Sequence, residues 1–201
     1  MNIDFQYHVT TIILAGGKST RMGRDKALIS IQGVPMLQLI CTIAEACTDQ
    51  IYIVTPWPER YQELLTPKSQ FIREVPLSGE TGNESRTHGA LVGFMQGLAA
   101  VETNWVLLLA CDLPNLRIEI LQNWICQLDT IPENKIAALV QNNQIWQPLC
   151  GFYRRRCLPE LREYITAGGR SFQQWLKSYS VEVLLLENLE MLFNFNKNIP
   201  E

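Results

Sequence analysis

An apolar run that ends at a pair of glycines constrains the fold of this chain more than any other feature. The run, Val9–Leu14, is rich in β-branched residues and is followed, after Ala15, by Gly16 and Gly17. This pattern predicts a buried strand that opens into a tight loop. Because glycine has no Cβ, the N–H groups of such a loop are able to approach a ligand closely.

The residues after the glycines are strongly cationic, with Asp25 as the only acid among them. Backbone N–H groups and cations together hold phosphate groups, so this loop is a candidate polyphosphate site. The alternative is a solvated basic loop that follows a core strand. The cations of the loop are Lys18, Arg21, Arg24 and Lys26.

Two familiar nucleotide motifs are excluded at this loop. A Walker A loop requires a glycine five positions before Gly17, and Ile12 stands there instead. The Gly-x-Gly-x-x-Gly fingerprint of dinucleotide-binding folds is also absent from the stretch. Phosphate binding here would therefore follow another pattern.

Composition bounds the architecture and the partners. A chain of 201 residues with 47% apolar residues predicts a single domain, 1–201, with a sizeable core. The net charge of −3 argues against a nucleic-acid partner, so the cationic loop favours a small anionic ligand.

The cysteines and the apolar segments indicate a cytoplasmic protein without a membrane partner. The six cysteines show no C-x-x-C spacing, which favours buried free thiols over disulfides or zinc. Residues 1–4 carry no basic stretch of the kind that opens a signal peptide. The longest apolar stretch, 106–111, is too short to span a bilayer.

Hydrophobic periodicity predicts strands that alternate with helices. This alternation predicts an α/β, doubly wound and mostly parallel sheet, with a late hairpin that covers part of it. The polar segment 78–88 is either a lid over a site or a surface insertion. Strands are predicted at 9–14, 28–31, 51–54, 71–75, 105–110 and 181–186, helices at 36–47, 59–65, 91–98, 118–128, 158–166 and 172–177, and the hairpin at 137–140 and 145–146 about Asn142-Asn143.

A second candidate site follows the apolar run Trp105–Ala110, which continues as Cys111-Asp112-Leu113-Pro114. Carboxyl ends of parallel strands share one sheet edge, so Asp112 is expected near the glycine loop. A carboxylate there is suited to hold Mg²⁺ while phosphate oxygens complete the coordination. The alternative is that Asp112 caps the helix that begins near Asn115 or Arg117.

The order of residues in both stretches resembles the nucleotidyltransferases that are similar to molybdenum cofactor guanylyltransferase. The matching residues are Leu14-Ala15-Gly16-Gly17, Ser19, Arg21-Met22-Gly23, Asp25-Lys26-Ala27-Leu28 and Cys111-Asp112-Leu113-Pro114. In that family the Leu-Ala-Gly backbone holds the nucleotide, the lysine matching Lys26 contacts its phosphates, and the Cys-Asp-x-Pro element binds magnesium. The resemblance implies a Rossmann-like fold of the nucleotidyltransferase type.

Weaker matches extend the resemblance over nearly the whole chain. Residues 89–93 resemble the family's Gly-Pro-Leu-Ala-Gly segment, residues 193–196 its closing Asn-x-Asn, and Gln147-Pro148 an element of its second half. Glu74 and Ala90 stand where the family usually has aspartate and proline, and Thr55 stands near its nucleotide-binding asparagine; these departures bear on base selection. The resemblance implies nucleotide contacts at Leu14, Ala15, Gly16, Gly17, Lys26, Thr55, Glu74, Gly89, Leu91 and Asp112, and magnesium ligands at Asp112 and Asn196.

The activity that the resemblance implies is guanylyl transfer. A terminal phosphate oxygen of molybdopterin would attack the α-phosphate of GTP, with Lys26, Arg21 and Asp112 as the catalytic residues and Mg²⁺ as the cofactor. Transient complexes with proteins of molybdenum cofactor biosynthesis and insertion are also implied. Two alternatives stay open: a sister enzyme that transfers a cytidylyl group, and a nucleotide-binding or partner-docking protein without catalytic activity.

Several other residues have a structural interpretation that is favoured over a functional one. His8 and His88 lack a zinc-ligand pattern, and Ser19 lacks a histidine base. Trp146 is expected to pack, with a pterin pocket as its alternative role. Residues 154–156 are expected to form a solvated face, with contact to an anionic substrate as the alternative.

Overall fold

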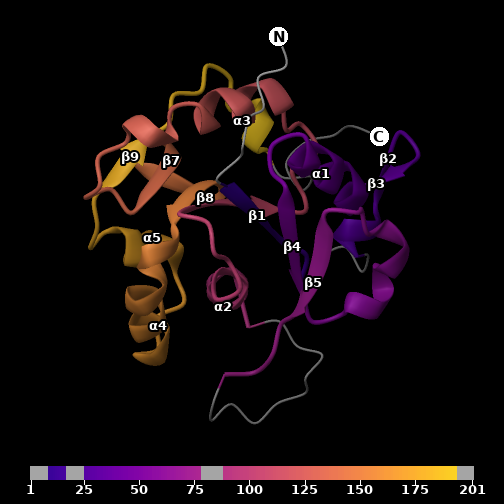
Figure 1. The fold of residues 1–201 in the computed structure, drawn as a ribbon, viewed down its shortest axis with the longest axis horizontal. Helices are drawn as coiled ribbons and strands as arrows, with labels where there is room; N and C mark the ends of the chain where they lie inside the picture. Colours follow the sequence, from indigo (N-terminus) through magenta and orange to yellow (C-terminus); the bar gives the residue numbers. More distant parts are fainter. Residues whose placement is uncertain (1–8, 17–24, 78–87, 194–201) are drawn as a thin grey trace.

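The apolar run before the glycines is strand β1 (Val9–Leu14), and it lies near the middle of a seven-stranded sheet (Figure 1). The computed structural model describes residues 9–16, 25–77 and 88–193. The strand order is β5-β4-β1-β6-β8-β7-β9. The other strands are β4 (Gln50–Thr55), β5 (Ser69–Arg73), β6 (Trp105–Ala110), β7 (Ala137–Asn142), β8 (Ile145–Arg154) and β9 (Val181–Val183).

Parallel pairing brings the ends of three strands to the same level. Leu14 pairs with Val54 of β4 on one side and with Ala110 of β6 on the other. Strand β8 runs antiparallel to both β6 and β7, whereas β9 is parallel to β7. The predicted hairpin is therefore present as β7 and β8, but it continues the sheet rather than covering it.

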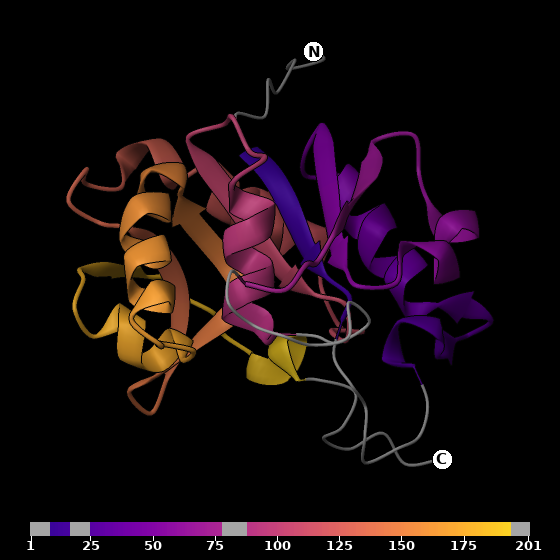
Figure 2. The ribbon, with the colours of Figure 1, turned by 90° about the horizontal axis from the view of Figure 1, so that it is seen from below.

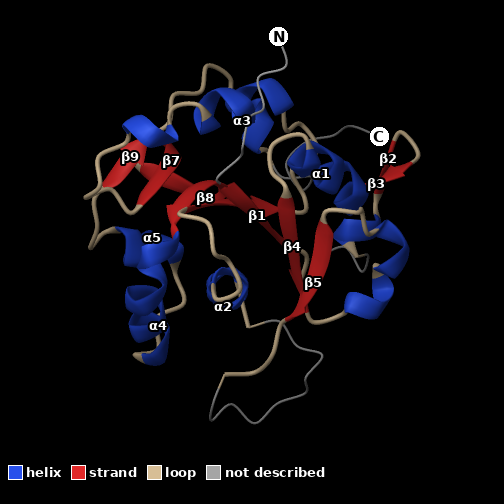
Figure 3. Cartoon of the chain, in the orientation of Figure 1, coloured by secondary structure: helices blue, strands red, loops and turns tan. Residues whose placement is uncertain are grey.

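Helices cover both faces of the sheet, as expected of a doubly wound α/β fold (Figure 3). Helices α1 and α3 pack on one face, and α2, α4 and α5 pack on the other. These helices span Met36–Glu45 (α1), Ala90–Leu98 (α2), Ile118–Ile125 (α3), Leu158–Thr166 (α4) and Phe172–Leu176 (α5).

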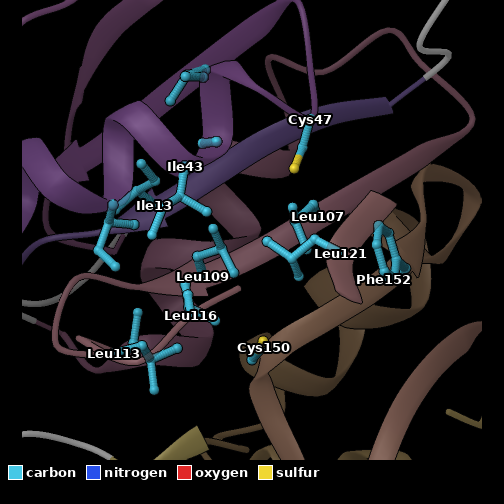
Figure 4. Packing of buried hydrophobic residues seen from close by; sticks show 14 of the residues in the cluster. Ile13, Ile43, Cys47, Leu107, Leu109, Leu113, Leu116, Leu121, Cys150 and Phe152 are labelled. Atoms are coloured by element: carbon cyan, nitrogen blue, oxygen red, sulfur yellow. The ribbon is translucent and has the colours of Figure 1, made fainter. Parts of the chain in front are cut away.

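Alternation along the central strands divides the core into two layers. Ile13 and Leu107 pack with Leu121 on the side of α1 and α3 (Figure 4), whereas Ile12 and Leu108 pack toward α2 and α4. All of these side chains are buried. Strand β6, which is buried at every residue, confirms the prediction of a central strand covered on both faces.

Helix α2 lies directly over the parallel strands, with α4 and α5 beside it (Figure 2). Gly97 permits this approach, because a Cβ on it would lie 2.9 Å from Val54 Cγ2 and 3.0 Å from Ile12 Cγ2. The first turn of the helix lies over the carboxyl ends of β1 and β4, where a Cβ on Gly93 would be 3.5 Å from Leu14 Cδ2 and 3.7 Å from Val54 Cγ1.

The prediction of a helix at 59–65 was wrong. The segment forms two 3₁₀ turns, η2 (Pro58–Arg60) and η3 (Gln62–Leu64), which meet at Tyr61. Tyr61 has φ −121° and ψ 10°, which interrupts helical geometry, and its side chain is buried with 1% exposure. Tertiary burial of one tyrosine thus overrides the local helical pattern.

Several other elements have boundaries that differ from the predicted ones. Residues 26–28 form a 3₁₀ turn, η1 (Lys26–Leu28), and the short strand β2 (Ser30–Ile31) pairs with β3 (Val34–Pro35). The hairpin turn is centred on Asn143 and Gln144, which both have positive φ, and β8 continues to Arg154. The last strand, predicted at 181–186, ends at Val183.

The cysteine prediction is confirmed: all six are free thiols, and only Cys126 is exposed. Among the described residues, no helix combines the length and the apolar character needed to cross a membrane.

Candidate active site

A pocket opens at the carboxyl ends of the parallel strands, and we call it the strand-end pocket. Its volume is about 180 Å³. The end of β1, the residues after β6, the turn before α2 and the first turns of α2 all contribute to its wall. Its lining residues are Leu14, Ala15, Gly16, Asp25, Lys26, Ala27, Val54, Glu74, Gly89, Ala90, Gly93, Ala110, Cys111, Asp112 and Leu149.

An ion pair between Lys26 and Asp112 joins the two stretches that the sequence singled out. Lys26 Nζ donates to Asp112 Oδ2 at 2.7 Å, and the two side chains are 18% and 11% exposed. Lys26 begins η1, whereas Asp112 follows β6 directly. Partial burial lowers the effective dielectric constant around the pair, so these charges act more strongly than surface charges. A phosphate entering the pocket would meet this ammonium.

Asp25 is a pocket residue that sequence reasoning did not select. Its Oδ1 accepts a hydrogen bond from the Ala27 N–H at 3.1 Å, which caps η1. Its Oδ2 accepts one from the Tyr61 hydroxyl at 2.6 Å and lies 3.7 Å from Arg60 Nη1. An aspartate directly before a short turn is a capping signal that the sequence did contain. The contact with Tyr61, which lies 36 positions away, left no local signal.

Glu74 presents a buried carboxylate to the other side of the pocket. It is 4% exposed, and its Oε1 accepts a hydrogen bond from the His88 N–H at 2.6 Å. Burial raises the pKa of the Glu74 carboxyl above its usual range, and the His88 hydrogen bond offsets part of that increase. The Glu74 N–H donates to the Thr55 carbonyl at 2.9 Å, which fixes the backbone after β5.

Gln96 of α2 holds the residue that follows Glu74. Its Oε1 accepts from the Val75 N–H at 2.9 Å, and its Nε2 donates to the Val75 carbonyl at 2.7 Å. The side-chain amide of Gln96 thereby makes the two backbone hydrogen bonds to Val75 that a residue of a neighbouring strand would make. Gln173 of α5 makes the same pair of bonds to Trp146 at the start of β8, at 3.2 and 2.7 Å.

Two of the predicted nucleotide contacts do not line the strand-end pocket as described. Thr55 is fully buried, and its Oγ1 accepts a hydrogen bond from the Trp57 N–H at 3.2 Å. Leu91 packs into the core beneath α2. Gly89 does line the pocket and has φ +96°, a conformation that favours glycine at the start of α2.

Several predicted residues lie outside the described residues. They are Gly17, Arg21 and Asn196, together with Lys18, Arg24, His8 and all of segment 78–88 except His88. Their proposed roles stay predictions.

Cys111 lines the pocket between the end of β6 and Asp112. Burial raises the pKa of its thiol to about 12, with the charge of Asp112 as a second cause. Cys111 is therefore a neutral thiol at neutral pH, which makes it a poor nucleophile.

The donor set of the pocket fits magnesium bound together with a substrate. Mg²⁺ typically takes one or two carboxylates and completes its shell with water and phosphate oxygens. Asp112 supplies such a carboxylate at the wall of the pocket, with Lys26 engaging Oδ2. The part of the chain that the structure describes holds no cluster of three or more His, Cys, Asp or Glu suited to a metal. A site made by protein ligands alone is thus not indicated there.

A second hollow of about 190 Å³ adjoins the first and shares Leu149 with it. Its wall comes from the first half of β8 and from Leu113 and Leu192. Gln147 and Pro148, which the resemblance singled out, line this hollow. Trp146 does not line this hollow. It is partly buried and packs against the core layer beneath α2, α4 and α5.

The interpretation of residues 154–156 as a solvated face was wrong for Arg154. Its guanidinium stacks 4.1 Å from the centroid of Trp105 and donates to the Ile131 carbonyl at 3.0 Å. Arg155 and Arg156 donate to the carbonyls of Val101 and Glu133. Trp105 opens β6, at the end of the strand opposite Asp112. None of the three lines either of the two hollows described above.

Comparison with known proteins decides the family. A model of the MobA-like NTP transferase domain matches residues 11–183. The chain belongs to the MobA-like NTP transferase family. A probable molybdenum cofactor guanylyltransferase from Nostoc is 58% identical over 94% of this chain and 86% of its own length. Another from Synechococcus elongatus is 40% identical over 92% of each chain.

A solved structure of a MobA-like protein shares the fold. Molybdopterin-guanine dinucleotide biosynthesis protein A from Archaeoglobus fulgidus superposes with a TM-score of 0.73 and 18% identity, covering 93% of this chain and 92% of that one. At this identity the likeness concerns the fold alone. Membership of the MobA-like NTP transferase family supports nucleotidyltransferase activity for the chain.

Proposed function

We propose that the chain transfers GMP from GTP to the terminal phosphate of molybdopterin and releases pyrophosphate. The names of the relatives support these substrates. The observation that carries the proposal is the Lys26–Asp112 pair, because it sets a cation suited to phosphate beside a carboxylate suited to a metal ion. Transient complexes with proteins that supply or receive the cofactor, and a cytoplasmic location, belong to the same proposal.

We propose that the Glu74 carboxylate recognises the base of the nucleotide. Its carboxylate is buried in the pocket wall, and its Oε2 would lie 3.8 Å from a Cβ on Gly93. Guanine offers N–H donors on its pairing edge, and a carboxylate accepts from them. Cytosine presents an amino group but lacks the adjacent N–H, so the same carboxylate favours guanine.

In the proposed reaction, a terminal phosphate oxygen of molybdopterin attacks the α-phosphorus of GTP. The bond from that phosphorus to the bridging oxygen breaks, and pyrophosphate leaves with the electron pair. The amide of Gly16 and the ammonium of Lys26 would orient and neutralise the phosphates, with Gly17 and Arg21 assigned the same task. Mg²⁺, held by Asp112 and by the proposed ligand Asn196, would supply further neutralisation of phosphate charge when bound. No protein nucleophile is required.

Calorimetric titration with GTP, CTP and ATP in the presence of Mg²⁺ tests the proposal, followed by an assay of pyrophosphate release with molybdopterin. We expect GTP to bind most tightly, Asp112→Ala to weaken that binding, and release to require molybdopterin. Preference for CTP would assign the sister cytidylyl activity instead. Nucleotide binding without pyrophosphate release would indicate a protein without catalytic activity.

A further inference from the structure

The hydroxyl of Tyr61 has a placement that packing alone does not explain. The ring of Tyr61, the residue between η2 and η3 in the chain, is buried in the core, and the hydroxyl donates to Asp25 Oδ2 at 2.6 Å. A hydroxyl that donates to a carboxylate forms a short and strong bond. One end of Tyr61 thus belongs to the core, whereas the other holds a residue of the pocket wall.

Asp25 is held on both sides of its carboxylate. Oδ1 caps the turn η1 through the Ala27 N–H at 3.1 Å, and the Asp25 carbonyl accepts from the Leu28 N–H at 3.1 Å. Arg60 adds a positive charge 3.7 Å from Oδ2, and its guanidinium lies 4.4 Å from the centroid of Trp57. Lys26, the next residue along the chain, is the first residue of that capped turn.

The charge of Asp25 makes this restraint important. A carboxylate that lines a phosphate pocket repels the phosphate, and it would compete for the ammonium of Lys26 if it turned inward. The Tyr61 hydroxyl and Arg60 both engage Oδ2 and hold it toward η2 and η3. Lys26 is left paired with Asp112, in the direction of the pocket.

We propose that Tyr61 is a positioning residue of the nucleotide site, which acts through Asp25 to keep Lys26 available for the phosphates of the nucleotide. This inference rests on the proposed function. Burial and the hydrogen bond to Asp25 raise the pKa of the Tyr61 hydroxyl above its ordinary value, so it remains a donor at neutral pH.

A double-mutant cycle on nucleotide affinity tests the proposal. Dissociation constants for GTP with Mg²⁺ are measured for the wild type, Tyr61→Phe, Lys26→Ala and the double variant, together with thermal unfolding of each. Phenylalanine keeps the buried ring, so only the hydroxyl is removed. Tyr164→Phe serves as the matched control, because its hydroxyl reaches the Ser171 carbonyl at 3.4 Å, away from the pocket.

We expect Tyr61→Phe to weaken GTP binding about five- to tenfold, which corresponds to the net contribution of one ordinary hydrogen bond, because Tyr61 acts on Lys26 only through Asp25. In the Lys26→Ala background the same substitution should change the affinity less than about twofold, since the group that it positions is gone. The loss of thermal stability should be equal in both backgrounds. Tyr164→Phe should leave GTP affinity at the wild-type value.

Three outcomes would overturn the inference. GTP affinity unchanged in Tyr61→Phe, with normal binding by the wild type, leaves the proposed function intact and makes Tyr61 a core residue only. If Tyr61→Phe lowers GTP affinity by the same factor in the Lys26→Ala background as in the wild type, then Tyr61 does not act through Lys26. A wild-type protein that binds no nucleotide removes the proposed function together with the inference.

Discussion

Lys26, beside the parallel half of the sheet, and two cations beside the other half have different surroundings. In the parallel half, β5-β4-β1-β6, Lys26 pairs with a carboxylate at the wall of a pocket. In the half that contains β8, β7 and β9, Lys135 and Arg154 donate to the carbonyls of Val181 and Ile131. A cation fixed on the backbone supports structure, whereas a cation beside a hollow is able to share its charge with a ligand.

The largest expected effect is on the rate of turnover, and it comes from replacing one lysine in each half by alanine. Lys26→Ala removes the group proposed to neutralise phosphate charge, and loss of such a group costs on the order of 10²–10³ in rate. Lys135→Ala, which loses a bond to Val181 and an ion pair with Glu182, should leave turnover within about twofold of the wild type. Initial rates of pyrophosphate release measure both. Comparable rates in the two variants would contradict the distinction between a lysine that serves the ligand and a lysine that supports the structure.

Two glycines provide the next comparison, because their surroundings differ. A Cβ on Gly151 of β8 would lie 2.6 Å from Leu139 Cδ2 and 2.8 Å from the Ala138 carbonyl oxygen. We expect Gly151→Ala to lower the free energy of unfolding by roughly 1–3 kcal/mol without changing GTP affinity.

Gly93→Ala should have the opposite effect. Its Cβ would meet Leu14 Cδ2 at an ordinary 3.5 Å, but it would occupy the pocket beside Glu74. Stability should be retained, because alanine favours the helix by up to about 1 kcal/mol, while GTP affinity falls. Urea unfolding and calorimetric titration separate the two quantities. Equal loss of stability in the two variants would contradict this assignment.

The paired glutamines give a smaller and more closely matched test. Gln96→Leu and Gln173→Leu each remove two bonds to one backbone residue, Val75 and Trp146 respectively. Each should cost about 1 kcal/mol of stability per bond. Only Gln96→Leu should weaken GTP binding, by about threefold, because Val75 is joined directly to Glu74. An equal change in GTP affinity for both would show that the clamp on Val75 has no special role.

The smallest effect concerns the pH dependence of stability. The pKa of Glu74 is raised in the folded protein, so the native state binds its proton more tightly than the unfolded chain does. Wild-type stability is therefore lost as the pH rises from about 4.5 through the folded-state pKa. Glu74→Gln stays neutral and keeps an acceptor for the His88 N–H. Its unfolding free energy relative to the wild type should rise over that interval, and parallel curves would contradict the prediction.

Local pattern predicted the strands best where burial is complete. β1 and β6 have the predicted limits because their runs of apolar and β-branched residues are unbroken and are followed, one residue later, by glycine or aspartate. The same pattern placed Lys26 and Asp112 at one sheet edge, which the ion pair confirms. The full length of β8 was missed, since Pro148 and Gly151 interrupt its sequence pattern without breaking the strand.

Of the remaining misses, one depends on a contact between distant segments and the other on a turn within a few residues. Tyr61 gives the segment 59–65 a helical pattern locally, but its hydrogen bond to Asp25 favours two separate turns. Thr55 was predicted to contact the nucleotide because it stands near a nucleotide-binding position of the family, yet its hydroxyl accepts a hydrogen bond from the Trp57 N–H. Hydrophobic periodicity predicts neither contact, because Asp25 lies 36 positions from Tyr61 and the bond from Trp57 depends on turn geometry two residues away.

The late position of β8 in the sequence bears on when the pocket is able to form during synthesis. Lys26 and Asp112 are 86 positions apart, and Leu149 of β8 completes the wall beside them. A nascent chain that has exposed β1 and its glycine loop therefore still lacks the pocket until β8 pairs with β6. Formation of contacts this distant in sequence is slow. A nucleotide that binds only the finished pocket would stabilise the completed sheet, so nucleotide binding and the last step of folding are thermodynamically linked.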